Sequence, residues 1–471
     1  MHSSPPRSGL RTLIGTRSFY RMVLSVAIPI MIQNGITNFV NLLDNIMVGQ
    51  VGTDQMSGVS IANQLIFIFN LSIFGGISGA GIFVAQFFGS GNTDGVRYAF
   101  RFKLLVALGV VLAAMAVFIP AGSTLISAFL HEGSETGDLN ATLRYGREYL
   151  SVMLLGLPAF ALNQCYAGTL RETGETVLPM KSGIAAVLVN LCFNYLLIFG
   201  KLGLPALGAT GAAVATVISR YTECAITIIW THTHTDRAPF IVNAWRHFRI
   251  PKSLAAQIAK KGFPLLLNEF LWSCGMSLLT QCYSTRGLAT IAAINITNTI
   301  TNLFSIVFMS LGSSVSIIIG QLLGAGQLEE ARRQDTQLIA FSVATCFVVG
   351  IALVAFAPLF PRLYNTTDEV RGIATSLIWA AAAIMPFNAF THAAYFTLRS
   401  GGKTFVTFLF DSVFVCVITV PLAWCLSRLT ALPIVPLYLL CQGTEAIKCI
   451  IGFCMLKKGV WVNNIVAETN G

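Results

Sequence analysis

The chain has 471 residues, of which 55% are apolar and only 11% are charged, and its mean hydropathy is +0.71. This composition excludes an ordinary soluble domain and is typical of a polytopic membrane protein. The net charge of +10 favours a membrane-topology signal over nucleic-acid binding, because Lys and Arg gather in the connections between apolar segments.

Apolar segments of about 20 residues, enough for a helix to cross the hydrocarbon core, recur almost from end to end. Runs such as LLVALGVVLAAMAVFIPAG do not alternate apolar and polar residues, which argues against the strands of a membrane β-barrel. We therefore predict an all-α polytopic membrane protein. The twelve predicted spans are 22–48, 58–88, 104–128, 149–170, 181–200, 208–231, 257–284, 290–322, 337–360, 372–397, 405–427 and 433–456.

The basic residues predict the orientation of these spans. By the positive-inside rule, both termini and the long basic connection in the middle of the chain face the cytoplasm. The predicted organisation is a cytoplasmic tail, a six-helix lobe, a basic linker, a second six-helix lobe and a second cytoplasmic tail. Their limits are 1–21, 22–231, 232–256, 257–456 and 457–471.

The two lobes are repeats of each other. An offset of 235 aligns residues 29–91 with residues 264–326 without a gap, and an offset of 228 aligns Pro158 with Pro386 and Arg171 with Arg399. Six helices per repeat give both halves the same orientation in the membrane, so they are expected to be pseudo-symmetric bundles with the substrate path between them. This organisation is typical of a transporter.

Acidic residues inside predicted spans are either paired or functional, because a charge near the bilayer centre costs about 2.5–3.5 kcal/mol on insertion scales. Glu223 lies three residues from Arg220, and Glu445 lies three residues from Lys448, which predicts structural pairs. Asp411 lies near the cytoplasmic start of its helix, where water or Lys403 could reach it.

Asp44 and Glu269 have no basic residue within a helical turn, so both are interpreted as functional. A carboxylate that is shielded from water can exchange a proton or bind Na⁺, which is the chemistry that ion coupling requires. A carboxylate that faces a cavity can also attract a cationic substrate. Beyond a possible Na⁺ at Asp44 or Glu269, no metal site is predicted.

Amide side chains accompany these acids. Asn190 and Asn194 are four residues apart and share a helix face, which indicates an ion-coupling site together with Asp44. The alternative is that such amides join helices through hydrogen bonds worth about 0.6 kcal/mol each. His392 is interpreted mainly as a packed polar residue, with a role in a cavity as the alternative. The remaining candidates for a substrate or second cation site are Gln33, Asn34, Asn63, Gln64 and Asn298.

The sequence contains no motif for catalysis or for ATP binding, so we expect no enzyme activity and no cofactor. The 11 cysteines are scattered without metal-ligand spacing and are interpreted as core residues. Transport would therefore draw its energy from an ion gradient or from the gradient of the substrate itself.

Several segments resemble the multidrug and toxic compound extrusion (MATE) family, in particular its bacterial NorM-like branch. They are DNIMVGQVGTDQMSGVSIANQ at 44–64, LLNEFLW at 266–272 and GQLLGAGQLEEAR at 320–332. The resemblance implies two lobes around a central cavity, alternating access, and export of organic cations in exchange for H⁺ or Na⁺. We also expect a monomer in the bacterial cytoplasmic membrane, with the lipid bilayer and small organic cations as partners and no nucleic acid.

The resemblance assigns the family's first-helix aspartate to Asp44, its fifth-helix asparagines to Asn190 and Asn194, and a seventh-helix glutamate to Glu269. One position departs from the pattern. NorM-like members can have a cation-binding aspartate in the tenth helix, and the matching residue here is Asn388. Asp44 is therefore the leading coupling carboxylate, and Glu269 is the substrate anchor or a second ion ligand.

Two alternatives are a flippase of the same fold superfamily and a membrane enzyme or sensor, which is a different class of protein. A flippase for a lipid-linked sugar would need several basic residues in its cavity to hold pyrophosphate, whereas Arg220 and Lys448 are the clear bases at mid-membrane and both have acidic neighbours. A membrane enzyme or sensor would need a nucleophile with a base, or a set of metal ligands. The sequence favours the antiporter over both.

Overall fold

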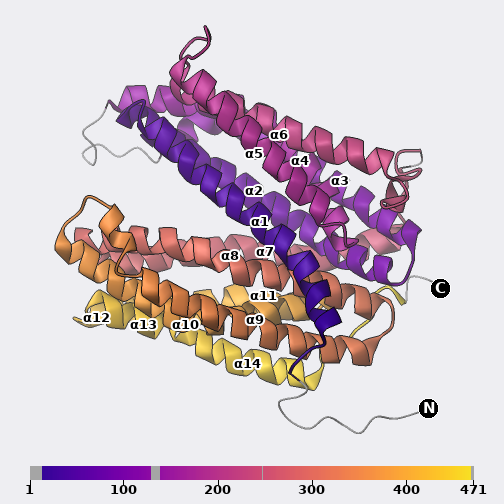
Figure 1. Ribbon diagram of the computed structural model, residues 1–471. Coiled ribbons are helices and arrows are strands. Elements are labelled where there is room, and N and C mark those ends of the chain that lie inside the picture. Colours follow the sequence, from indigo (N-terminus) through magenta and orange to yellow (C-terminus); the bar gives the residue numbers. More distant parts are fainter. Residues whose placement is uncertain (1–12, 129–137, 247, 468–471) are drawn as a thin grey trace. The chain divides into compact units, whose positions relative to one another are not determined.

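The described residues form helices joined by short connections (Figure 1). The structure is a computed structural model and describes residues 13–128, 138–246 and 248–467. Its α-helices are α1 (Arg17–Gly49), α2 (Thr53–Gly89), α3 (Thr93–Ser127), α4 (Leu139–Glu172), α5 (Val177–Phe199), α6 (Gly208–Thr233), α7 (Lys252–Ser284), α8 (Leu288–Gly324), α9 (Leu328–Phe356), α10 (Asp368–Ser400), α11 (Thr404–Phe408), α12 (Val420–Leu429), α13 (Ile434–Gln442) and α14 (Thr444–Lys458). The predicted all-α class is confirmed.

Short helical elements complete the chain. The 3₁₀ turns η2 (Pro239–Ile241) and η3 (Phe360–Leu363) lie in connections. The π-helical turns η4 (Leu409–Val413) and η5 (Val415–Thr419) lie between α11 and α12 and continue the same span.

Eleven helical segments of the described residues are long and apolar enough to cross a membrane, and each overlaps one of the twelve predicted spans. The predicted span at 257–284 lies in α7, which is not among the eleven although it is 33 residues long. Asn268 and Glu269 interrupt its apolar run. The predicted count of twelve is therefore close, and the difference lies in a helix with polar residues at its centre.

The predicted repeat is visible in the helices themselves. α1 and α7 have 33 residues each, and α2 and α8 have 37 each. Pro29 lies inside α1 at the position that Pro264 takes in α7. After α2 and α8 the chain turns at Gly91 and Gly326, with φ of +74° and +72°, a left-handed conformation that favours glycine.

Packing divides the chain into two compact units. The N-terminal unit comprises Ile32–Val84 and Thr93–Ala259, and the C-terminal unit comprises Met1–Met31, Ala85–Asn92 and Lys260–Gly471. The lobe limits predicted at 22–231 and 257–456 describe the sequence repeat, not this packing, and they stay a prediction. So does the cytoplasmic location of the termini.

Within the N-terminal unit, α4 packs against α3 and α6, and α6 packs against α5. Small residues allow this close approach: a Cβ added to Gly211 of α6 would lie 2.6 Å from the carbonyl oxygen of Leu197 in α5. The polar faces of α5 and α6 are thereby held next to each other.

Within the C-terminal unit, α10 is the central helix and packs against α8, α9 and α14. The first turns of α1 join its largest apolar core. Residues of this core include Phe19, Val23, Ala27, Leu311, Val315, Ile319, Leu338, Ala393, Leu398 and Trp461. Helix α1 therefore contributes its first part, up to Met31, to the C-terminal unit and the rest to the N-terminal unit.

The ends of α2 and α8 contact each other backbone to backbone within the C-terminal unit. A Cβ added to Gly324 would lie 1.9 Å from the carbonyl oxygen of Gln86, and a Cβ added to Gly89 would lie 1.9 Å from that of Gln321. Gln86 and Gly89 of α2 correspond in the repeat to Gln321 and Gly324 of α8. The correspondence has a structural reason, because each glycine lets the backbone of the other helix come close.

The segment that follows α14 holds this crossing together. Ile465 N donates to Gln86 Oε1 at 2.8 Å, and Gln86 Nε2 donates to the carbonyl oxygens of Ser400 at 2.8 Å and Asn463 at 3.2 Å. Asn464 Nδ2 donates to the carbonyl oxygen of Gly324 at 3.1 Å. The C-terminal segment therefore joins the ends of α2, α8 and α10.

We expect Gly324→Ala to lower the free energy of unfolding by about 1–3 kcal/mol, because the new methyl group would force the ends of α2 and α8 apart. Gly109→Ala in α3 is the control, since an added Cβ there meets no described atom within 4 Å. Thermal unfolding of the purified variants in detergent checks both. Equal melting temperatures for the two variants would contradict the close crossing.

Candidate functional site

Asp44 lies in the second half of α1, and the structure brings it together with the two predicted asparagines of α5. Asn194 Nδ2 donates a hydrogen bond to Asp44 Oδ1 and another to Asn190 Oδ1 at 3.0 Å. Asn190 Nδ2 in turn donates to Thr216 Oγ1 of α6 at 3.4 Å. Asp44, Asn194, Asn190 and Thr216 therefore form one chain of polar contacts inside the N-terminal unit.

The local sequence explains this geometry. Asn190 and Asn194 are one helical turn apart on α5, so their side chains lie on the same face. Both are buried, with 4% and 0% of their surface exposed, whereas Asp44 is half-buried. A hydrogen bond to an ionised acceptor is stronger than one between neutral groups. The amide of Asn194 thus stabilises the Asp44 carboxylate where water is partly excluded.

The same contacts leave oxygen atoms free. Asn194 Oδ1 is buried and accepts no hydrogen bond from the described part of the chain. Among the described side chains, only Asn194 donates a hydrogen bond to the Asp44 carboxylate, and the acceptor is Oδ1. An incoming proton or a small cation would therefore find an amide oxygen and a carboxylate oxygen available at this position.

Other predicted amides of the N-terminal unit lie elsewhere. Gln33 Oε1 accepts from Arg171 Nη1 at 3.1 Å, and Asn63 Oδ1 accepts from the Tyr149 hydroxyl at 3.2 Å. Asn34 contributes its carbonyl oxygen to the amide of Asn38, and Gln64 is exposed. Gln33 and Asn63 therefore have protein partners, as the packing interpretation of these amides expects.

The predicted pair of Arg220 and Glu223 forms no direct ion pair among the described residues, although each group acts electrostatically on the other. The guanidinium of Arg220 lies 5.0 Å from the centroid of the Phe160 ring, and its Nη1 is buried without a hydrogen-bond partner among the described residues. Residues three apart on a helix lie on one face, but here Arg220 turns towards α4 instead of its acidic neighbour.

A pair that the sequence analysis missed lies between α3 and α4. Lys103 Nζ binds Glu172 Oε2 and donates to Thr169 Oγ1 at 3.3 Å, and the Lys103 side chain is fully buried. Lys103 lies just before the predicted span at 104–128, whereas α3 already begins at Thr93. The approach of α3 to α4 buries this lysine.

In the C-terminal unit the predicted residues are less concentrated. Glu269 is half-buried on α7, and the charges that act on it come from Arg399 of α10 and Asp411. The His392 ring lies 4.9 Å from the ring of Phe308 on α8, which agrees with a packed polar residue.

Two predicted amides of this unit contribute no contact to Glu269 among the described residues. Asn388 lies one turn before His392 on α10 and offers its carbonyl oxygen to Thr391 Oγ1 at 3.2 Å. Asn298 is exposed on α8.

The acidic residues of the last spans form a cluster around Lys448. Its Nζ lies 3.2 Å from Glu445 Oε1, so the predicted pair of these two residues is confirmed. Asp411, for which the sequence suggested water or Lys403 as a partner, has a basic partner in Lys448, whose Nζ lies 3.3 Å from Asp411 Oδ1. The sequence could not indicate this contact, because the two residues are 37 positions apart on different helices.

Comparison with known proteins gives a consistent result. The MatE family model matches residues 29–196 and 264–425. The probable multidrug resistance protein NorM of Thermotoga maritima is 24% identical over 410 residues, which cover 86% of this chain and 85% of that protein. The multidrug resistance protein MdtK of Edwardsiella ictaluri is 26% identical over 365 residues, which cover 77% and 78%.

A solved structure shows the same fold. The crystal structure of a MATE protein in complex with MaL6 superposes with a TM-score of 0.84 at 19% identity and covers 96% of this chain and 98% of that chain. The two matched segments of the family model begin at the repeat-related prolines Pro29 and Pro264 and together include Asp44, Asn190, Asn194 and Glu269. The chain is therefore a bacterial, NorM-like member of the MatE family of membrane transporters.

Proposed function

We propose that this transporter exports organic cations across the bacterial cytoplasmic membrane in exchange for H⁺ or Na⁺, and that Asp44 is its coupling carboxylate. The observation that carries the proposal is the hydrogen bond to Asp44 from the buried amide of Asn194, which also donates to Asn190, in place of a contact with a basic residue. The names of the relatives, which are multidrug resistance proteins, support the choice of substrate class.

The exchange follows from the charge of Asp44. An ionised carboxylate attracts an organic cation, whereas a carboxylate that has bound H⁺ or Na⁺ does so weakly. Binding of the ion on the outer side therefore favours release of the drug, and loss of the ion on the inner side restores the negative charge. A ligand shifts a conformational equilibrium by its difference in affinity for the two states, so drug and ion would drive opposite movements.

The surroundings of Asp44 suit this exchange of charge. A neighbouring Lys or Arg would hold the carboxylate permanently ionised, whereas Asn194 offers a donor to the ionised form and an oxygen to a bound proton or cation. Glu269 would act as the anchor of the substrate or as a second ion ligand. Its partner in some NorM-like proteins, an aspartate of the tenth helix, is replaced here by Asn388.

Asp44→Asn should abolish export, because the amide keeps the size of the side chain but cannot change its charge. The measurement is the efflux of a fluorescent organic cation from cells that express each variant at equal level. Asp138→Asn is the control, since Asp138 caps the exposed start of α4 and asparagine caps a helix equally well. Export by Asp44→Asn at the parental rate would show that another group couples the ion.

The coupling ion is tested with purified protein in liposomes loaded with a fluorescent organic cation. We expect release of the dye under an inward gradient of either H⁺ or Na⁺, and no acceleration by the other ion. Release that no ion gradient accelerates, for any cation tried, would contradict antiport. Translocation of a lipid-linked pyrophosphate in the same liposomes would favour the flippase.

A further inference from the structure

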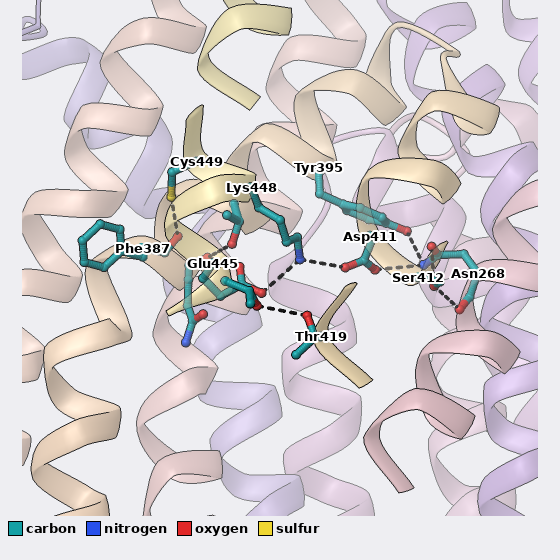
Figure 2. A network of polar contacts seen from close by, with 12 residues as sticks. Asn268, Phe387, Tyr395, Asp411, Ser412, Thr419, Glu445, Lys448 and Cys449 are labelled. Atoms are coloured by element: carbon teal, nitrogen blue, oxygen red, sulfur yellow. Dashed lines mark hydrogen bonds and ion pairs between the residues drawn. The ribbon is translucent and has the colours of Figure 1, made fainter. Parts of the chain in front are cut away.

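A lysine of the C-terminal unit lies between two carboxylates (Figure 2). Lys448 Nζ lies 3.3 Å from Asp411 Oδ1, 3.2 Å from Glu445 Oε1 and 5.6 Å from the centroid of the Phe410 ring. Only 6% of the Lys448 side chain is exposed, against 20% for Asp411 and 17% for Glu445. Negative charge and an aromatic face, both of which attract cations, thus surround the ammonium group.

The backbone positions Asp411 for this contact. Asp411 lies in η4, where the helix widens to a π-helical turn, a feature that is frequent at functional sites. Its second oxygen, Oδ2, accepts from Asn268 Nδ2 at 3.1 Å, and Asn268 Oδ1 accepts from Ser412 Oγ at 2.7 Å. Figure 2 shows Lys448 and Asn268 approaching Asp411 from opposite sides. Both oxygens of the carboxylate are therefore bound.

Without the ammonium group, the cluster would consist of oxygen ligands. Asp411 Oδ1 and Glu445 Oε1 would lose their shared partner, and Glu445 Oε2 is already buried without a hydrogen bond among the described residues. Two hydroxyl groups are found near Glu445. Thr444 directly precedes Glu445 in the sequence, and its Oγ1 lies 3.0 Å from Thr419 Oγ1. Carboxylate and hydroxyl oxygens are the ligands that hard cations take.

Lys448 has two advantages over a free cation. It is covalently attached, so its effective concentration at the carboxylates is far above that of an ion in solution. A free ion that displaced it would also leave a buried ammonium group without a partner, which is strongly unfavourable. Other charged or titratable groups near the cluster include Glu269 on α7, His392, Tyr395 and Arg399 on α10, and Cys449 on α14.

We propose that Lys448 is the resident cation of the Asp411–Glu445 pair and that it excludes Na⁺ from this part of the C-terminal unit. The lysine is a selectivity residue: it occupies the acidic cluster, so that the exchanged ion acts at Asp44. The statement that the exchanged ion acts at Asp44 rests on the function proposed above. Exclusion of Na⁺ from the Asp411–Glu445 pair is measured by binding, without transport.

The test replaces the ammonium and retains both acids. Lys448→Gln is purified in choline chloride and titrated with NaCl at constant ionic strength, and binding is followed with radioactive sodium and by thermal unfolding. We expect Lys448→Gln to gain one bound Na⁺ per chain relative to the wild type, with apparent Na⁺ affinity at least about tenfold higher. Lys448→Arg keeps the cation and should show no gain.

Two further variants make the result specific. Lys457→Gln removes an exposed lysine from the same helix, α14, and should bind Na⁺ as the wild type does. Lys448→Gln combined with Asp411→Asn should lose the additional Na⁺. A Lys448→Gln protein that folds in NaCl but not in choline chloride would also support the proposal, because Na⁺ would then replace the missing ammonium.

Sodium binding by Lys448→Gln no greater than by the wild type would overturn the proposal. If that variant folds in neither salt, the comparison of the wild type with Asp411→Asn decides: equal Na⁺ binding supports exclusion by Lys448, and reduced binding in Asp411→Asn overturns it. A failure of Asp44 to couple transport changes none of these readings, so the two proposals fail separately.

Discussion

The cost of keeping an ionised side chain among apolar helices constrains every polar contact in this protein. A charge at the centre of a bilayer is unfavourable by several kcal/mol unless a partner compensates it. In both units the structure supplies such partners: Glu172 for Lys103, Lys448 for Asp411 and Glu445, and Asn194 for Asp44. Asp44 is the exception within this set, since its partner is a neutral amide.

That difference in partner is the basis of the proposed role of Asp44 as an exchangeable charge. A carboxylate paired with lysine stays ionised, because protonation would leave the buried ammonium uncompensated. A carboxylate held by an amide can take up a proton or a cation and release it again, at a smaller change in free energy. The two halves of the sequence repeat therefore share helices, prolines and turns, yet their acids have different partners and are suited to different tasks.

Much of the fold follows from the sequence. The spans are predictable because hydrocarbon thickness sets helix length, and the repeat is predictable because Pro29, Gly91 and their counterparts Pro264 and Gly326 fulfil the same backbone requirements. The face shared by Asn190 and Asn194 follows from helical periodicity. The span in α7 is less apolar than the others, since Asn268 and Glu269 interrupt its apolar run.

Contacts between helices that are distant in the chain could not be predicted. Spacing along one helix indicated both the pair of Glu445 with Lys448, which forms, and the pair of Arg220 with Glu223, which does not form directly. The contact of Asp411 with Lys448 depends on how the last spans pack, and the burial of Lys103 depends on how α3 approaches α4. The direction of a side chain in a helix bundle depends on the neighbouring helix. The sequence of one segment does not specify which helix that is.

In the proposed exchange, drug and ion compete for the charge of Asp44. The most direct measurement adds an organic cation to purified protein in weakly buffered detergent solution and follows released ions with a pH indicator and a Na⁺-selective electrode. We expect drug binding to release H⁺ or Na⁺ from the wild type and neither ion from Asp44→Asn. Drug binding without ion release, or equal release from both proteins, would contradict it.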